Sequence, residues 1–316
     1  MNIGILYDAN NYFKSGIEKD FHILSEITKI SDALTELKHN AILIDGIAEL
    51  IDLIALKKKQ VDVIMNLIPW TRTSQKINAT CFLDFYNIPF IGNGEKALIL
   101  CADKYISKLI AHNNGIKVPR YIYDRTPEKK STSYATIKQV LGCPFIIKAN
   151  GSSGSLGVRK VHSELELDSV RKNFTQKWNT GFLYEEYVEG HDIMVPIISK
   201  NGTPHALGVV KYLNSRKENI LFFSTEMKYF EEIQCVPYDT DETKMALIYA
   251  ECIHSALGCT FFSRSDFRIT PDGQIYFLEC NATPELNPSG AFVVASKKAS
   301  LSALLLDIID ESITKT

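Results

Sequence analysis

Residues 262–281 read FSRSDFRITPDGQIYFLECN, two alternating apolar runs joined by the dipeptide Asp272-Gly273. Asp-Gly between such runs is a strong signal for a β-hairpin, because both residue types tolerate the backbone of a tight turn. A two-residue turn at this dipeptide determines which residues face each other along both strands. The stretch therefore predicts an antiparallel hairpin with a defined register.

A metal site is predicted on one face of this hairpin. With that turn, Asp266 faces Glu279 and Arg264 faces Asn281, and all four side chains share one face. Two opposed carboxylates repel each other, and a hard cation such as Mg²⁺, which prefers carboxylate and amide oxygens, removes that cost. Arg264 beside them can bind a phosphate or an oxyanion. The alternative is an exposed acidic hairpin with an ordinary ion pair to Arg264.

The first 95 residues alternate apolar runs with helical patterns. The strand-like runs lie at residues 3–7, 41–44, 61–65 and 89–92, and the helical patterns at 20–38 and 76–86. Such alternation is typical of a parallel sheet covered by helices. We predict an α/β domain over residues 1–95.

The remainder mixes strands and helices less regularly. One helix is predicted over residues 95–114, with Gly115 at its end, and another near 241–257. We predict a central α+β subdomain over residues 96–182 and a C-terminal α+β subdomain over residues 183–316.

A Gly- and Ser-rich segment follows the apolar run that ends at Lys148. It reads GSSGSLG over residues 151–157 and leads into a strand. It lacks the Gly-Lys-Ser/Thr ending of a P-loop and the helix of a dinucleotide fingerprint. Its backbone N–H groups and hydroxyls can fold over phosphates, with Lys148 as a point charge. A surface turn without a ligand is the alternative.

Two acids interrupt an apolar strand at Glu185-Glu186, just before Tyr187-Val188. A buried acid needs a partner, and an adenine amino group or ribose hydroxyls are candidates. The backbone of Val188 is available to the ring, and Asp192 to the ribose. The alternative is a half-exposed strand with outward-pointing acids.

Together these motifs resemble the ATP-grasp superfamily, and within it the D-alanine–D-alanine ligase-like branch. The resemblance covers roughly residues 90–290 and is strongest in the hairpin. It implies an ATP-grasp fold of the α/β and α+β class, with a Rossmann-like N-terminal parallel-sheet domain and two α+β subdomains that enclose the nucleotide. It also implies ATP, and Mg²⁺ for which Mn²⁺ can substitute.

The resemblance implies roles for individual residues. The ATP-binding set comprises Lys104, Lys148, Ser153, Gly154, Ser155, Gly157, Glu185, Glu186, Val188, Asp192 and Lys228. The metal ligands are Asp266, Glu279 and Asn281. The catalytic groups, which stabilise charge on the transferred phosphoryl group and on the acyl phosphate, are Arg264, Lys228 and Lys148. Residues 212–232 are predicted to form a mobile lid.

The acceptor side departs from the ligase pattern. Three segments differ: residues 8–11 read DANN in place of a Gly-rich segment, 66–70 read NLIPW in place of His-Gly, and 284–286 read PEL in place of Pro-Gly-Met. Tyr229 resembles the lid tyrosine, whose usual serine partner falls at Gly154, where Ser153 or Ser155 can substitute. The resemblance therefore does not imply D-alanyl-D-alanine synthesis.

The last helix offers a contact for the acceptor. An apolar periodic run begins at Ala291, so we expect the helix to start near Ser289, with unpaired N–H groups there. An amino-acid carboxylate can bind the backbone of Ser289 and Gly290. Glu285 beside it favours an acceptor with a second donor or positive group. A simple Ser289 N-cap is the alternative.

Composition excludes several other classes of protein. The 316 residues are 45% hydrophobic and carry a formal net charge of −2, so no general attraction to nucleic acid or anionic membrane is expected. The seven cysteines contain no C-x-x-C pair, which argues against a zinc knuckle or a thioredoxin-type site. No signal peptide or membrane span is recognisable, which predicts a cytoplasmic protein. A homodimer is left open.

We predict an ATP-dependent carboxylate–amine ligase that joins small amino-acid-like substrates through an acyl phosphate and releases ADP and phosphate. Its partners are small amino acids or carboxylates rather than nucleic acid or membrane. Two alternatives stay open. One is transfer of the activated acyl group to another acceptor, such as a carrier-protein thiol. The other is a non-catalytic nucleotide-binding regulatory module.

Overall fold

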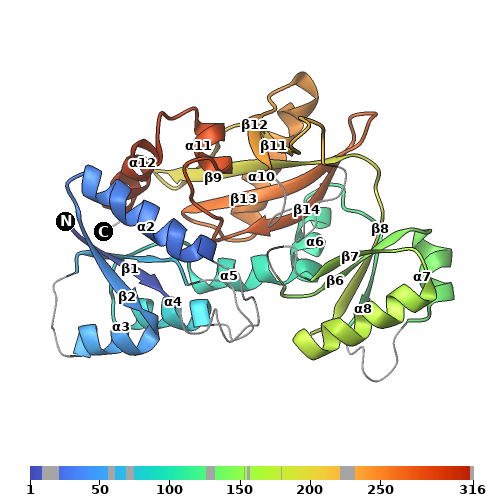
Figure 1. The fold of residues 1–316 in the computed structure, drawn as a ribbon, viewed down its shortest axis with the longest axis horizontal. Helices are drawn as coiled ribbons and strands as arrows, with labels where there is room; N and C mark the ends of the chain where they lie inside the picture. The colour runs from blue at the N-terminus through green and yellow to red at the C-terminus, as the bar shows by residue number, and fades with distance from the viewer. Residues whose placement is uncertain are drawn as a thin grey trace.

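Three β-sheets with flanking helices follow one another along the long axis of the molecule in the computed structural model (Figure 1). The structure describes residues 1–8, 21–55, 61–68, 75–125, 132–152, 154, 157–178, 180–220 and 232–313.

The N-terminal sheet is parallel, as the alternation of apolar runs predicted. Its strand order is β2-β1-β3-β4, formed by β1 (Asn2–Tyr7), β2 (Asn40–Asp45), β3 (Val63–Asn66) and β4 (Phe90–Ile91). The connecting helices are α2 (Phe21–Glu36), α3 (Gly46–Ala55) and α4 (Gln75–Phe85). Four consecutive residues of β1 are buried, as expected for a strand covered on both faces.

The helix predicted over residues 95–114 is two helices, α5 (Glu95–Ala102) and α6 (Lys104–Asn113). They are separated at Asp103, which has an extended backbone and accepts a hydrogen bond from Ile106 N at 3.0 Å. Asp is a favoured N-cap because its carboxylate satisfies a free N–H of the first turn. The single-helix prediction was wrong because this cap starts a new helix directly before Lys104.

The central sheet has the strand order β5-β8-β6-β7 and is antiparallel. Its strands are β5 (Tyr121–Asp124), β6 (Phe145–Ala149), β7 (Val158–Val161) and β8 (Phe182–Glu186), and its helices are α7 (Tyr134–Leu141) and α8 (Glu164–Lys177). The strand β8 thus pairs within the central sheet, although the predicted boundary assigned its residues from 183 onward to the next subdomain. The domain boundaries themselves stay a prediction.

The C-terminal sheet has the order β12-β11-β9-β13-β14, with β10 beside β9. Its strands are β9 (His191–Lys200), β10 (Thr203–Ala206), β11 (Val210–Leu213), β12 (Gln234–Pro237), β13 (Phe262–Ile269) and β14 (Ile275–Asn281). The 3₁₀ turn η1 (Asp241–Thr243) leads into α10 (Lys244–Ala256), which packs on this sheet together with α5 and α6. The packing of α5 and α6 on β14 brings Lys104 to the hairpin.

The C-terminal helices return to the N-terminal sheet. They are α11 (Ala291–Ser296) and α12 (Leu301–Ile313), and α12 lies against α2, close to both ends of the chain (Figure 1). One hydrophobic core therefore joins Ile3 and Leu34 with Leu304 and Ile308.

The predicted hairpin is present, with a turn that is longer than predicted. Thr270 N donates to Gln274 O at 3.0 Å, so three residues rather than two form the turn. A β-bulge follows Asp266 and leaves one extra residue, Leu278, in β14. The extra turn residue and the bulge compensate each other, so the predicted pairs of Asp266 with Glu279 and of Arg264 with Asn281 are confirmed.

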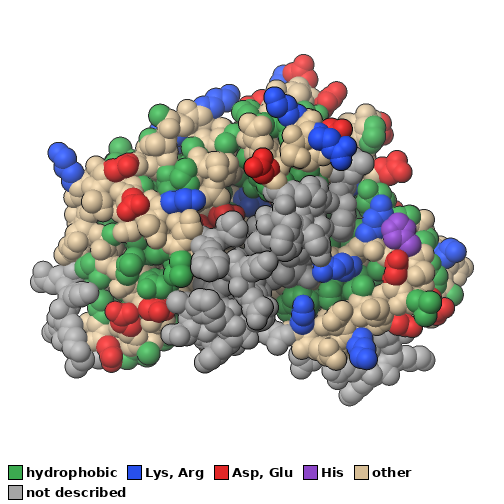
Figure 2. Space-filling view, in the orientation of Figure 1, with side chains coloured by type: hydrophobic (Ala, Val, Ile, Leu, Met, Phe, Trp, Pro, Cys, Tyr) green, Lys and Arg blue, Asp and Glu red, His purple; other side chains and the backbone are tan. Residues whose placement is uncertain are grey.

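The surface carries mixed charge, without a large patch of one sign on the face in Figure 2, where basic and acidic side chains are interspersed. No described helix is long and apolar enough to cross a membrane.

Candidate active site

The hairpin face holds the predicted metal ligands around Arg264. The guanidinium forms a bidentate ion pair with Asp266, with Nε–Oδ1 and Nη2–Oδ2 distances of 2.7 Å. Asn281 Nδ2 donates to Asp266 Oδ2 at 3.3 Å. The register places Glu279 directly opposite Asp266. The structure thus brings the four predicted hairpin residues together on one partly buried face.

The two opposed carboxylates differ in their electrostatics. Burial raises the pKa of Asp266 to about 6, although Arg264 opposes this shift. Burial also acts to raise the pKa of Glu279, but Lys104, Lys148 and Arg264 hold it at about 2. Glu279 therefore stays ionised at neutral pH. The repulsion between Glu279 and Asp266, which a metal ion would otherwise offset, is already reduced by the neighbouring cations.

Lys104 joins the hairpin to the phosphate loop. Its buried ammonium lies 3.3 Å from Glu279 Oε2 and donates to the carbonyl of Ser152. Asn150 donates to the Asp103 carboxylate at 3.0 Å, which connects the loop to the start of α6. One cation thus contacts two predicted elements of the nucleotide site, as a phosphate-contacting lysine should.

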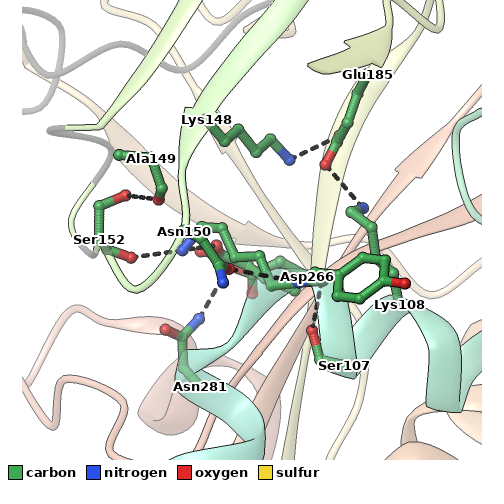
Figure 3. Close-up of polar contacts among 12 residues, drawn as sticks. Ser107, Lys108, Lys148, Ala149, Asn150, Ser152, Glu185, Asp266 and Asn281 are labelled. Carbon is green, nitrogen blue, oxygen red and sulfur yellow. Dashed lines mark hydrogen bonds and ion pairs between the residues drawn. The ribbon is translucent and has the colours of Figure 1, made fainter. Parts of the chain in front are cut away.

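A buried ion triad lies behind Lys104. Glu185 is 2% exposed and lies between Lys108 and Lys148, with N–O distances of 3.1 Å and 2.9 Å (Figure 3). Burial favours a raised pKa for Glu185, yet the two lysines lower it below its ordinary value. Burial also lowers the pKa of Lys108 to about 8, despite the attraction of Glu185.

In the structure Glu185 is the shared partner of two lysines. The residue holds two ammonium groups, one of them the predicted phosphate contact Lys148. Among the described residues, no donor makes a well-directed hydrogen bond to Glu185 Oε1. An adenine amino group at this oxygen stays a prediction. Lys108 was missed, although it lies one helical turn after Lys104 and therefore on the same face of α6.

A second residue that the sequence reasoning missed is Arg268. It pairs with Asp192 at 2.7 Å and donates to the carbonyls of Val188 and Gly190, at 2.5 Å and 3.0 Å. The buried Arg268 guanidinium thus binds both Asp192, the predicted ribose contact, and the backbone of Val188, the predicted adenine contact. A signal was present: Arg-x-Asp-x-Arg places Arg268 on the same strand face as Arg264.

The other acid of the pair, Glu186, faces away from this cluster. It accepts hydrogen bonds from the backbone N and from Nε of Arg120, at 2.8 Å and 2.6 Å. Its predicted contact with ATP is through its backbone, and the structure leaves that prediction open. The alternation along β8 thus buries Glu185 and turns Glu186 outward.

The two predicted glycines of the phosphate loop lie in different surroundings. A Cβ added at Gly157 would lie 2.3 Å from Ser152 Oγ and 3.1 Å from Ala149 Cβ, so a side chain there would displace the loop. Gly154 is exposed, with a φ of +63° and open space around it. Four predicted site residues lie outside the described parts of the chain: Ser153, Ser155, Lys228 and Tyr229.

The acceptor side differs in detail from the prediction. The last segment begins with a helix at Ala291, whose N-cap is Gly290, so Ser289 does not cap it. The N–H groups of Ser289 and Gly290 donate to Asn287, to its Oδ1 and its carbonyl, each at 3.1 Å. Asn287 Nδ2 also donates to Glu285 at 2.7 Å. Asn287 thus engages all three predicted substrate contacts that the structure describes.

Tyr212 on β11 was also missed. It is partly buried, and burial raises its pKa, which the charge of Arg264 opposes. It packs against a buried cluster that includes Ala291 and Ala295 of α11. Its neighbours were not recognisable from the sequence, because β11 and the segment after β14 lie far apart in the chain.

The assembled site suits a polyanion next to a hard cation. Five cationic groups converge here, namely Lys104, Lys108, Lys148, Arg264 and Arg268. They are balanced by four carboxylates, namely Glu185, Asp192, Asp266 and Glu279. Such charges stabilise negative charge that develops during phosphoryl transfer.

The fold and this site together define an ATP-grasp enzyme, an ATP-dependent ligase that forms carbon–nitrogen bonds. Residues 110–310 match the family D-ala D-ala ligase C-terminus. The chain belongs to that family.

Three known proteins illustrate what the chain is similar to. A D-alanine--D-alanine ligase of Fervidobacterium nodosum is 29% identical over 238 residues, which cover 72% of this chain and 73% of that protein. The structure of D-alanine--D-alanine ligase from Bacillus anthracis complexed with ATP has a TM-score of 0.74 at 20% identity, covering 100% and 98% of the two chains. The VanG D-Ala:D-Ser ligase of Enterococcus faecalis has a TM-score of 0.73 at 18% identity, covering 98% and 99%.

Proposed function

We propose that this ligase joins two small amino acids and uses Mg²⁺ with ATP. The observation that carries the proposal is the single hairpin face on which Asp266, Glu279 and Asn281 lie beside Arg264, with Lys104 reaching across from α6. The relatives are named for ligation of D-alanine, so D-amino acids are the first substrates to test.

The donor set fits Mg²⁺, since two carboxylates and an amide oxygen are hard ligands on one face. When bound, the ion would neutralise charge shared between the two terminal phosphates. Both Asp266 oxygens are engaged by Arg264, so that ion pair has to open or share an oxygen with the ion. In this proposal Arg264 then turns toward the acyl phosphate, where it stabilises the negative charge of the tetrahedral intermediate.

The remaining residues of the chain orient the nucleotide in this proposal. Lys104 and Lys148 hold phosphate oxygens, and Glu185 keeps Lys148 and Lys108 in place between turnovers. Gly154 and Gly157 let the loop backbone approach the phosphates. The substrate carboxylate attacks the terminal phosphate, and an amine then displaces phosphate from the acyl phosphate.

The test is phosphate release from ATP with amino acids and small acids, supplied singly and in pairs, followed by the mass of the product. We expect release to require a pair and the product to equal two substrates minus water. Release with one acid only, together with labelling of a carrier-protein thiol, would favour the thioester alternative. Binding of ATP without release under any combination would favour a regulatory module.

The acceptor side gives a separate test of substrate class. We expect an α-amino acid to be preferred over the amine that lacks its carboxylate, because Ser289, Gly290 and Asn287 present polar groups in one segment. Equal kcat/KM values for the two would remove the carboxylate contact while leaving the ligase reaction intact. An Asn287→Ala variant frees the Ser289 N–H and should change KM for the acceptor rather than for ATP.

A further inference from the structure

Three cysteines converge beneath the catalytic hairpin. Cys101 lies in the last turn of α5, Cys259 follows α10, and Cys280 lies in β14. Their three sulfur atoms are all within 4.8 Å of one another. All three residues are buried, whereas Cys81 and Cys143 are exposed on the surface. The spacing of the cysteines in the sequence does not predict this cluster, because its members come from three separate segments.

The sulfur positions match the dimensions of a thiolate metal site. The Cys101 and Cys259 Sγ atoms are 3.8 Å apart. Zinc–sulfur bonds of about 2.3 Å in a tetrahedron place neighbouring thiolates about 3.8 Å apart. A disulfide could join only two of the three sulfurs, whereas a soft cation accommodates all of them.

A buried hydroxyl, that of Ser265, lies beside the cluster. Ser265 lies directly opposite Cys280 in the ladder and is fully buried. Among the described residues its Oγ makes no well-directed hydrogen bond, and the Cys280 thiol is its polar neighbour. A buried hydroxyl with only a thiol beside it can supply an oxygen to a cation held by the three sulfurs. The nearby His254 uses both ring nitrogens in hydrogen bonds with Ser199 and Ser263. Neither nitrogen is therefore left for Ser265 or for a cation at the thiols.

We propose that Cys101, Cys259 and Cys280 bind a thiophilic d¹⁰ cation, zinc in the first instance, with Ser265 Oγ as the fourth donor. Each thiol gives its proton to solvent when the ion binds, and no electron is transferred. The proposal is independent of the ligase substrates. Cys280 points to the face of β14 opposite to Glu279 and Asn281, and the other two thiols lie against Cys280.

The site would act as a structural tie. Cys280 lies between Glu279 and Asn281, and Cys101 lies three residues before Lys104, the residue that pairs with Glu279, across the helix break at Asp103. An ion held by Cys101 and Cys280 therefore fixes α5 relative to β14 on the buried side of the same contact. We expect metal to raise the thermal midpoint rather than to take part in the reaction.

The first experiment titrates reduced, chelator-stripped full-length protein with Cd²⁺ and follows the ultraviolet charge-transfer absorbance of cadmium thiolates. We expect saturation at one ion per chain. The absorbance at saturation should fall by about one third in Cys280→Ala, because one of three thiolates is lost. Cys143→Ala is the matched control and should leave it unchanged. No band at one equivalent, or an unchanged band in folded Cys280→Ala, would overturn the proposal.

A second experiment needs no variant and so does not depend on folding of a mutant. Wild-type protein is alkylated in mild denaturant with and without Zn²⁺, and each cysteine is quantified by mass spectrometry. Zinc should slow modification of Cys101, Cys259 and Cys280 together, while Cys81 and Cys143 react at unchanged rates. Equal rates with and without zinc at the three buried thiols would refute the site. Weaker zinc binding by Ser265→Ala supports the fourth donor, and unchanged affinity removes it.

Discussion

Individual ion pairs determine the ionisation of the acids in this site. Asp266 and Glu279 face each other, yet Glu279 is kept ionised by Lys104 and Lys148 while burial raises the pKa of Asp266 to about 6. Each carboxylate therefore has its own cation, and neither depends on a metal for folding. A change that removes one negative charge here should therefore affect stability as well as function, because it leaves a buried cation without its partner.

Glu279→Gln tests the metal assignment at this scale. We expect kcat to fall by about 100-fold or more, since a direct ligand should matter at least as much as a residue that supports one. The thermal midpoint should also fall, because the buried Lys104 ammonium loses its carboxylate partner, although the 27% exposure of Glu279 limits the loss. Activity is measured across a range of Mg²⁺ concentrations. Near wild-type activity at limiting Mg²⁺ would show that Glu279 is not a ligand, and Glu242→Gln, at an exposed acid, is the control.

Gly157→Ala tests whether the loop needs its glycine for close packing. The new Cβ would lie 2.5 Å from Ser152 Cβ, so the loop must move and KM for ATP should rise at least several-fold. Adding Ser152→Gly removes the clashing side chain and should restore much of the affinity. Gly94→Ala, which has open space around its Cβ, is the control. A failure of the double variant to recover would place the defect outside this clash.

At the scale of elements, the junction of β8 and β9 depends on one arginine. Arg268 binds the carbonyls of Val188 and Gly190 while it neutralises Asp192 on β9. The segment between the central and C-terminal sheets is therefore held by a side chain of β13. The positions of Val188 and Asp192, both predicted nucleotide contacts, should depend on this arginine.

Arg268→Met should destabilise the protein by about 3 kcal/mol or less, since a buried pair loses one partner but Asp192 is 29% exposed. The free energy of unfolding is measured in denaturant. Adding Asp192→Asn should recover part of the stability without restoring KM for ATP. Arg120→Met removes the more exposed pair with Glu186 and should cost 1 kcal/mol at most, about the usual value of a surface ion pair. Equal losses for the two arginines would contradict the assignment.

At the scale of the whole molecule, the N-terminal helices are coupled to the catalytic segment. Glu26 on α2 accepts a hydrogen bond from Leu286 N at 2.7 Å, a few residues after the hairpin. Lys76 on α4 is 4% exposed, and burial lowers its pKa to about 7, although the charge of Glu26 opposes this. Folding thus removes an ammonium group from water in the N-terminal unit.

Stability should therefore rise with pH between about 7 and about 10. In that window Lys76 carries a proton in the unfolded chain and has lost it in the folded chain. Raising the pH therefore increases the free energy of unfolding, by at most about 1.4 kcal/mol per pH unit. Lys76→Met removes this dependence, and we expect it to be more stable than wild type near pH 7. That difference should shrink toward pH 10. Denaturant unfolding at several pH values measures it.

Lys172→Met, at an exposed position on α8, provides the matched control. It should leave the pH dependence of wild type unchanged. A constant stability difference between Lys76→Met and wild type over the whole window would mean that Lys76 stays protonated in the folded state. The buried Lys108, with a pKa of about 8, contributes to both proteins alike and cancels in the comparison.

The sequence by itself determined the class of fold and the hairpin pairs. Apolar alternation gave the parallel N-terminal sheet, and the order of motifs indicated the ATP-grasp ligases. Asp266 opposite Glu279 was predicted correctly although the assumed turn was too short, because the bulge at Leu278 restored the register. These features follow from local chain periodicity, which a single sequence displays.

The pairing of each cation with its acid depends on how distant segments pack. Lys108 reaches Glu185, and Arg268 reaches Asp192, across separations of more than seventy residues. The three buried thiols meet for the same reason, since α5, the segment after α10 and β14 pack together. Sequence periodicity assigns each side chain to a face, but burial of charge and of thiols is set by whichever segment packs against that face.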